Sequence, residues 1–382
     1  MTDSCPFDKG GSYFNANRPF DIMKKKGGVK YMEKIFLSIV NPEQVRKEIE
    51  SEYVANYPEF DSQLSCPDES DGKQESNERY QKKVEQETRW MTALVEATCG
   101  EIRKVLEREK PDKDNLYVFL LPECWMHARN DSREKAERGE GVTEYKRPFV
   151  PEAVRSMVRE DSAYCRLTSD YPNLLLCPGT VWWKDMVWYE EEKKFREVYF
   201  QSAPVFWQGK CILFWDKQLM SEKDGAGRYS DANKGKWEKW MDYRKRILRT
   251  AGVAVEELTD EQTLIEAIVK YIADIHEPIR STLGVEYSKL NKKNVFYLEW
   301  QGEKISFSIE ICLDCAYKIT EKLNEPKPDI QLVVSNSLGF CWDLTYMNEC
   351  AFWCDFECGS FRFAKKAEKM AMEGGKIVWK EV

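Results

Sequence analysis

Histidine is the scarcest functional side chain in this sequence of 382 residues, with only His127 and His276 present. A metal site built from several histidines is therefore excluded by number alone. Neither histidine stands near a nucleophile in a context that matches a Ser-His-Asp or Cys-His site. If the chain is an enzyme with a cysteine nucleophile, its base is expected to be a carboxylate or a lysine.

Long apolar runs are also lacking. None reaches the roughly 18 residues of a membrane span, and no apolar segment of the signal-peptide type follows Met1. The formal net charge is −8, whereas phosphate binding rests on clustered Lys and Arg. We therefore expect a cytoplasmic protein with neither a membrane nor a nucleic acid as its partner.

Cysteine, by contrast, is plentiful. The 13 cysteines are an odd number and are scattered through expected strands and helices. This distribution favours free thiols in a reducing compartment over a disulfide framework. The apolar fraction of 42% and the aromatic fraction of 13% can fill a substantial core, so one large domain or two ordinary ones are expected.

Three apolar runs in this sequence share one design, because each leads into a polar residue. The run at 305–311 leads into Cys312, the run at 116–123 ends in Glu123, and the run at 211–217 ends in Lys217. Strand ends at one edge of a sheet are where α/β folds place their chemistry. A thiol, a carboxylate and an ammonium are thus predicted to meet at one edge.

Strand and helix patterns alternate along the chain, which indicates an α/β fold in layers. Gln-Gly pairs at 208–209 and 301–302 predict two hairpins. Helices are predicted at 43–53, 81–109, 151–168, 316–323 and 361–372, and strands at 34–40, 116–123, 173–183, 198–207, 211–215, 295–300, 305–311, 330–335 and 376–379.

Domain organisation follows from changes in composition. Residues 1–33 are polar and glycine-containing and are interpreted as an irregular arm, followed by one domain at 34–382. Within that domain, the segment 218–293 starts with Gly225, Gly227 and Gly235 and continues with two helical patterns. We interpret it as a helical insertion that packs as a cap near the predicted site, because both of its ends adjoin predicted site segments.

Several short motifs occur in a recognisable order. Pro122-Glu123 is followed by Pro178-Gly179-Thr180, by Ala203 with Lys217, and by Ile311-Cys312-Leu313-Asp314. In this order they resemble the motifs of the nitrilase superfamily, the carbon–nitrogen hydrolases. Gln201 stands where the family has an asparagine, and Leu313 stands where it has an aromatic residue.

The resemblance implies a fold and an activity. The fold would be a nitrilase-like α-β-β-α sandwich with a helical insertion. Glu123 would be the general base, Lys217 the oxyanion stabiliser and Cys312 the nucleophile that forms a thioester. The substrate would be a small-molecule amide or nitrile, with no cofactor. Glu222 matches a second glutamate of some members, and self-association into a homo-oligomer stays open.

General chemistry supports these residue types. A thiol needs a nearby base to become a good nucleophile. Desolvation of Glu123 would disfavour its ionised form and suit it to exchange a proton near neutral pH. The Lys217 ammonium and the Leu313 backbone N–H could stabilise the negative charge that develops on the substrate. His127, just past Glu123, is a candidate for lining the site.

Other interpretations remain open for the same residues. Cysteine is often simply buried, and Cys312 with Cys315 forms a C-x-x-C pair of the redox or zinc type. Cys350, Cys354 and Cys358 recur every four residues, which we interpret as a helical stripe of buried thiols. For the whole chain, the alternative to an enzyme is a catalytically inert relative that serves as a binding or assembly module.

Overall fold

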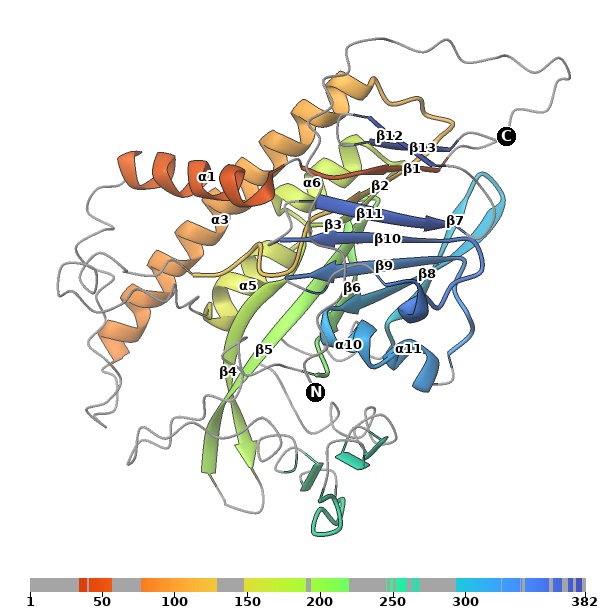
Figure 1. Ribbon diagram of the computed structural model, residues 1–382. Helices are drawn as coiled ribbons and strands as arrows, with labels where there is room; N and C mark the ends of the chain where they lie inside the picture. Colours follow the sequence, from red (N-terminus) through yellow and green to blue (C-terminus); the bar gives the residue numbers. More distant parts are fainter. Residues whose placement is uncertain are drawn as a thin grey trace, which may run out of the picture.

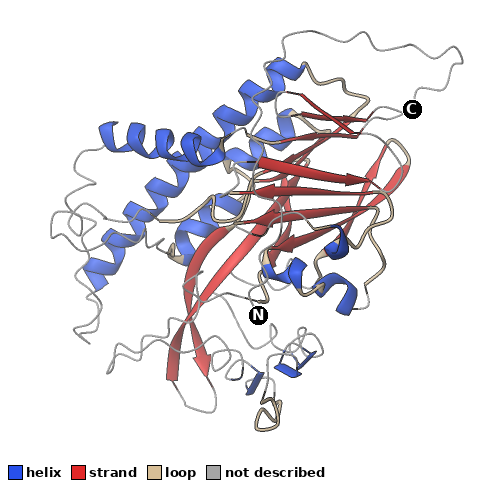
Figure 2. Cartoon of the chain, viewed as in Figure 1, coloured by secondary structure: helices blue, strands red, loops and turns tan. Residues whose placement is uncertain are grey.

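The structure of the chain is a computed structural model (Figure 1). It describes residues 34–39, 41–56, 77–128, 148–189, 194–219, 293–323, 325–336, 341–356, 360–365, 370–373 and 376–379, with residue 338 and short pieces between 245 and 267. The predicted arm at 1–33 lies outside these residues, as does most of the predicted insertion. The mixed α/β class is confirmed, because helices pack on two mixed sheets (Figure 2).

The first sheet is centred on parallel strands. In spatial order its strands are β12 (Met370–Glu373), β13 (Lys376–Trp379), β1 (Lys34–Leu37), β2 (Leu116–Leu120), β3 (Leu174–Cys177), β5 (Lys194–Trp207) and β4 (Val181–Tyr189), and β6 (Lys210–Asp216) also pairs with β5. Every residue of β2 and β3 is buried. Parallel strands of this kind are covered on both faces.

Helices provide the cover on one face of the first sheet. They are α1 (Pro42–Asn56), α3 (Asn77–Glu109), α5 (Pro151–Val158) and α6 (Ala163–Asp170). In α3, Trp90, Leu94, Ile102 and Leu106 recur at helical spacing and are almost fully buried. The helix predicted at 151–168 is two helices, because Ser162 caps α6 by accepting a hydrogen bond from the backbone N–H of Cys165.

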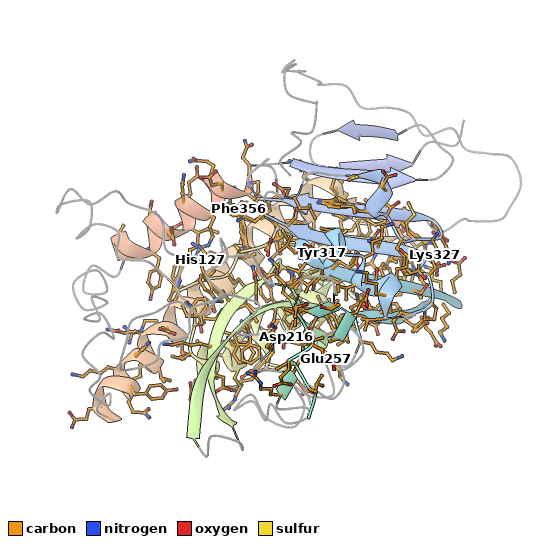
Figure 3. The ribbon with its side chains drawn as sticks, turned by 60° about the horizontal axis from the view of Figure 1, so that its bottom comes forward. His127, Asp216, Glu257, Tyr317, Lys327 and Phe356 are labelled. Atoms are coloured by element: carbon orange, nitrogen blue, oxygen red, sulfur yellow. The ribbon has the colours of Figure 1, made fainter. Side chains whose placement is uncertain are left out.

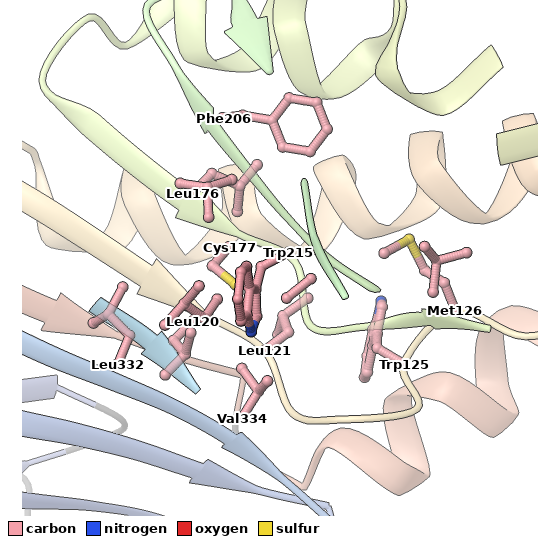
Figure 4. Packing of buried hydrophobic residues seen from close by; sticks show 14 of the residues in the cluster. Leu120, Leu121, Trp125, Met126, Leu176, Cys177, Phe206, Trp215, Leu332 and Val334 are labelled. Carbon is pink, nitrogen blue, oxygen red and sulfur yellow. The ribbon is translucent and has the colours of Figure 1, made fainter. Parts of the chain in front are cut away.

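The second sheet covers the other face. Its strands, in spatial order, are β11 (Ser360–Lys365), β10 (Cys350–Asp355), β9 (Ile330–Ser335), β8 (Glu303–Ile311) and β7 (Val295–Trp300). Leu332 and Val334 of β9 face Leu120 and Cys177 of the first sheet (Figure 4). The rings of Phe36 and Phe352 meet across the same interface, with centroids 5.3 Å apart. The main core therefore lies between the sheets.

Short helices lie against the outer face of the second sheet. These are α10 (Leu313–Ala316) and α11 (Ile319–Lys322), with the 3-10 turn η3 (Trp342–Leu344) nearby. Cys315 packs there on Val333 and Trp353. The helix predicted at 316–323 is thus two helices starting earlier, separated by Lys318 in the left-handed conformation at φ 53°.

Both predicted hairpins are confirmed. Gln208 and Gly209 connect β5 to β6 with φ values of 46° and 80°. Gln301 and Gly302 connect β7 to β8 with φ values of 52° and 83°. Two central residues with positive φ are the pattern of type I′ turns, which match the twist of the flanking strands.

Two predictions near the C-terminal end are wrong. The segment predicted as a helix at 361–372 forms β11 and β12, which pair with β10 and β13. Pairing with existing sheet edges overrides the local helical propensity there. The predicted helical stripe of thiols also fails, because Cys350 and Cys354 lie on β10. A separation of four residues places side chains on one face of a strand as well.

Described pieces of the insertion are helical and packed. Lys245, 248–249, 263–264 and 266–267 are helical. Leu248, Val255 and Leu264 are fully buried and belong to the main apolar cluster. In Figure 1 these pieces lie at the end of the molecule toward which β4 and β5 project. Throughout the described ranges, no helix is both long and apolar enough to cross a membrane.

Candidate active site at the strand ends

The three predicted catalytic residues stand just beyond three strands. Glu123 follows β2, Lys217 directly follows β6, and Cys312 directly follows β8. The strands β2 and β8 belong to different sheets that pack face to face. The candidate site therefore combines residues from both sheets, and these residues are far apart in the sequence.

Glu123 and Lys217 form a buried ion pair. The Lys217 Nζ donates to Glu123 Oε1 at 2.6 Å, across 94 residues of sequence. Both side chains are 0% exposed. Removing two charges from water is costly unless they are paired in good geometry. The structure thus brings together two of the three predicted catalytic side chains, in an environment where their charges are poorly screened.

The Glu123 turn is held by the segment that follows β3. A Cβ added to Gly179, at φ 77°, would lie 2.2 Å from the Pro122 carbonyl oxygen, so only glycine permits this approach. The Thr180 hydroxyl accepts a hydrogen bond from the Cys124 backbone N–H at 2.7 Å. The Pro178-Gly179-Thr180 motif therefore serves to fix the backbone on both sides of Glu123.

Gln201 adds to this support from β5. Its Nε2 donates to the Cys124 sulfur at 3.2 Å and to the Thr180 hydroxyl at 3.3 Å. Its backbone oxygen accepts from the Lys217 N–H at 2.8 Å. One residue of β5 is thus bonded both to the Glu123 turn and to Lys217, which fixes the two partners of the ion pair relative to each other.

Cys312 begins the turn after β8 with an unusual backbone. Its φ is 47° and its ψ is −104°, a combination that non-glycine residues rarely adopt. Its N–H donates to the Val334 oxygen at 2.9 Å, and its own oxygen accepts from Cys315 at 3.0 Å and Ala316 at 3.2 Å. Strained backbone of this kind is concentrated at functional sites and persists because its surroundings hold it.

Asp314 connects the Cys312 turn to the Lys217 segment. Its carboxylate accepts hydrogen bonds from the backbone N–H of Gln218, at 3.0 and 3.1 Å, and of Leu219 at 2.8 Å. Asp314 is 0% exposed. Asp314, two positions past Cys312, is therefore bonded to the two residues just past Lys217. This contact brings the turn of Cys312 to the segment that carries the ion pair.

Burial sets the charge states of the acids and thiols around this turn. Desolvation raises the pKa of Asp314 to about 7, although the N–H groups of Gln218 and Leu219 and the charge of Lys217 act to lower it. Desolvation likewise raises the pKa of the Cys315 thiol well above its usual value, and the nearby Glu310 carboxylate adds to the effect. Cys315 therefore stays protonated near neutral pH and is a poor nucleophile.

The remaining predicted residues have different fates. Leu313 is the first residue of α10 and is half-buried, so its N–H has no acceptor within the helix. His127 lies apart from Asp216 and Tyr317, toward the outer helices (Figure 3). Its Nδ1 lies 3.0 Å from the Ala128 oxygen, and its backbone oxygen accepts from Trp90 at 3.2 Å. Glu222 lies outside the described residues.

Asp314 is part of the motif that contains Cys312, but the sequence alone assigned it no function. The available signal was an acidic residue inside the otherwise apolar stretch ICLDCAY, because carboxylates are rarely buried without a partner. The role of Gln201 was missed as well. The sequence does hint at this role, because Gln201 stands where the nitrilase superfamily has an asparagine, which also carries a side-chain amide.

The C-x-x-C pair does not form a disulfide. Among the described residues, ten cysteines are present as thiols. In the same part of the chain, no group of three or more His, Cys, Asp or Glu side chains could hold a metal ion. The Cys315 sulfur instead lies in the outer cluster, 3.8 Å from the Leu344 oxygen.

No family model matches this sequence, and no curated protein matches it either.

Proposed function

We propose that this protein is a hydrolase of non-peptide carbon–nitrogen bonds, acting on a small amide or nitrile through a cysteine thioester. The observation that carries the proposal is the fully buried Glu123–Lys217 pair, 2.6 Å apart, connected through Asp314 to the turn of Cys312. Perturbed and buried charges beside a nucleophilic side chain are typical of active sites.

In the proposed reaction with an amide, Glu123 takes the proton of the Cys312 thiol. The sulfur attacks the carbonyl carbon, and the Lys217 ammonium with the Leu313 N–H stabilises the negative charge on the oxygen. The carbon–nitrogen bond then breaks, and the leaving amine takes the proton from Glu123. A thioester remains on Cys312, and a water activated by Glu123 hydrolyses it.

The burial pattern agrees with this division of roles. Measured over the whole residue, Cys312 is 8% exposed, whereas Glu123 and Lys217 are 0% and 2% exposed. Cys312 is thus the most exposed of the three proposed catalytic residues. In a site that excludes water, the ammonium interacts more strongly with developing negative charge than it would in solution.

The architecture supports the same proposal at the level of fold. In the described part of the chain, the helices α1, α3, α5 and α6, the two face-to-face sheets and the short helices α10 and α11 form successive layers (Figure 1). We infer that this is the α-β-β-α sandwich of the nitrilase superfamily, whose motifs the sequence resembles. The short helices then form the thin fourth layer.

Turnover of a library of small amides and nitriles tests the proposal, with Cys312→Ala as the inactive variant and Cys315→Ala as the matched control. We expect release of ammonia or amine from the wild type and from Cys315→Ala, and none from Cys312→Ala. Rapid acid quenching followed by mass spectrometry should show the acyl group on Cys312 during turnover.

The turnover assay together with thiol labelling separates the proposed hydrolase from the alternative, an inert binding or assembly module. If no amide or nitrile is turned over and brief, limiting iodoacetamide labels other thiols before Cys312, the chain is an inert binding or assembly module. Preferential labelling of Cys312 over Cys315 is the expected result, because the Cys315 thiol has a raised pKa.

A further inference from the structure

The chain leaves the first sheet through a fully hydrogen-bonded segment. The Lys217 N–H makes the last bond to the sheet, to the Gln201 oxygen at 2.8 Å. The next two N–H groups, of Gln218 and Leu219, donate instead to Asp314. Gln218 and Leu219 are 1% and 2% exposed. Buried N–H groups require acceptors, and here a side chain supplies them.

Asp314 is placed to act on both sides of the candidate site. Its backbone belongs to α10, two residues past the strained φ of Cys312. Its carboxylate reaches the first two residues of the insertion, one and two positions past Lys217. A displacement of this carboxylate would therefore move the Lys217 segment relative to the Cys312 turn.

Burial and charge act on Asp314 in opposite directions. Burial raises its pKa most, and Glu310 on β8 raises it further, whereas the N–H groups of Gln218 and Leu219 and the charge of Lys217 lower it. Glu310 is held separately, because it accepts from the Thr320 N–H at 3.0 Å and from the Thr320 hydroxyl at 2.7 Å. The two acids thus serve different segments, and only Asp314 reaches the start of the insertion.

We propose that Asp314 is a positioning residue: it holds the first two residues of the insertion against the Cys312 turn and so fixes the Lys217 ammonium relative to the Cys312 thiol. The catalytic roles of Lys217 and Cys312 in this statement rest on the proposed function. The other part of the proposal, that the Asp314 carboxylate orders Gln218 and Leu219, is independent of the proposed function.

Three variants of the full chain test the proposal. Asp314→Ala removes both acceptor oxygens. Asp314→Asn keeps an oxygen at the position of Oδ1, which accepts from both N–H groups, and replaces only Oδ2. Asp329→Ala is the matched control, because Asp329 accepts from the Ser306 N–H at 2.9 Å and from its hydroxyl at 2.7 Å, near the starts of β8 and β9.

Hydrogen exchange followed by mass spectrometry reads the order of the segment directly. In the wild type, the amides of Gln218 and Leu219 should be protected. We expect Asp314→Ala to increase their exchange rates at least tenfold, and Asp314→Asn and Asp329→Ala to leave them within about threefold of the wild type. Retained protection in Asp314→Ala overturns the proposal, whether or not the protein is an enzyme.

The pH dependence of Cys312 alkylation reads the consequence for the site. The midpoint pH of the reaction with iodoacetamide reports where the thiolate forms, and for an ordinary thiol it lies near 8.5. We expect a midpoint below that value in the wild type and in Asp329→Ala, and a rise of roughly one unit in Asp314→Ala. The Asp314→Asn variant should stay close to the wild type.

The two readouts separate two kinds of failure. An ordinary midpoint in the wild type counts against the proposed function, while hydrogen exchange still decides whether Asp314 orders the segment. A lowered midpoint that Asp314→Ala leaves unchanged overturns the positioning role and leaves the proposed function standing. Lost protection together with a raised midpoint in Asp314→Ala supports the proposal.

Discussion

Replacing Lys217 by methionine removes the cation of the buried pair while keeping most of the volume of the side chain. The Glu123 carboxylate, 0% exposed, then stays in the interior without that cation. Removing one partner of a buried pair typically costs about 3–5 kcal/mol of unfolding free energy. We expect Lys217→Met to destabilise the protein by an amount in that range at pH 7.

The double-mutant cycle isolates the interaction itself. Glu123→Gln alone should cost about 1–3 kcal/mol, since it leaves a buried ammonium. The double variant buries neither charge, and such replacements are often close to neutral. With a double variant close to neutral, the coupling free energy between Glu123 and Lys217 should equal the sum of the two single costs, about 4–8 kcal/mol.

A surface pair provides the control. Lys47 and Glu43 of α1 lie 2.7 Å apart, with side chains 55% and 51% exposed. This pair therefore has nearly the same distance between its charged atoms as Lys217 and Glu123, but it is exposed to water. The same substitutions there should give a coupling of only about 0.3–0.5 kcal/mol. High salt should weaken this surface coupling and leave the buried one nearly unchanged.

Urea unfolding followed by tryptophan fluorescence measures the wild type and the six variants, and equal denaturant slopes confirm that the variants unfold in the same way. A coupling below about 1 kcal/mol for Glu123 and Lys217 would refute the reasoning. The pair would then interact no more strongly than charges exposed to water.

Other changes test the support of the site and its charges. Gly179→Ala should lower the melting temperature sharply, because the new Cβ would lie 2.2 Å from the Pro122 oxygen. Gly100→Ala is the control: a Cβ there meets nothing within 4 Å, so this variant should gain up to about 1 kcal/mol of stability. Equal melting temperatures of the two variants would contradict the role of Gly179. The raised pKa of Asp314, about 7 against an ordinary 3.8, means that the folded state binds its proton more tightly. Stability should therefore fall as the pH rises from about 4 to 7, by roughly 4 kcal/mol from this group, and Asp314→Asn should remove that slope; an unchanged slope in urea titrations across this range would count against it.

Much of the secondary structure could be predicted from local patterns. The Gln-Gly turns gave both hairpins, because positive φ at two consecutive positions is a local requirement of the chain. The buried strands β2 and β9 were predicted from continuous apolar runs. The three strand-end residues were predicted by the same rule, since a polar residue that ends a buried run marks a sheet edge.

Predictions failed where competing structures had similar local patterns. Cys350 and Cys354 have a spacing that fits one face of a helix or of a strand, and pairing with β9 and β11 selected the strand. The helix predicted at 361–372 failed for the same reason, because this segment pairs with β10 and β13 as the strands β11 and β12.

The sequence by itself determined most of the strands, both hairpin turns and the polar residues at the strand ends, because these depend on interactions between residues close along the chain. Only the tertiary structure decided that Lys217 meets Glu123 across 94 residues and that Asp314 meets Gln218 across 96. Such contacts depend on the order of strands and on the packing of one sheet against the other. Their physical reason is that a buried charge or N–H group must find its partner wherever the fold places one.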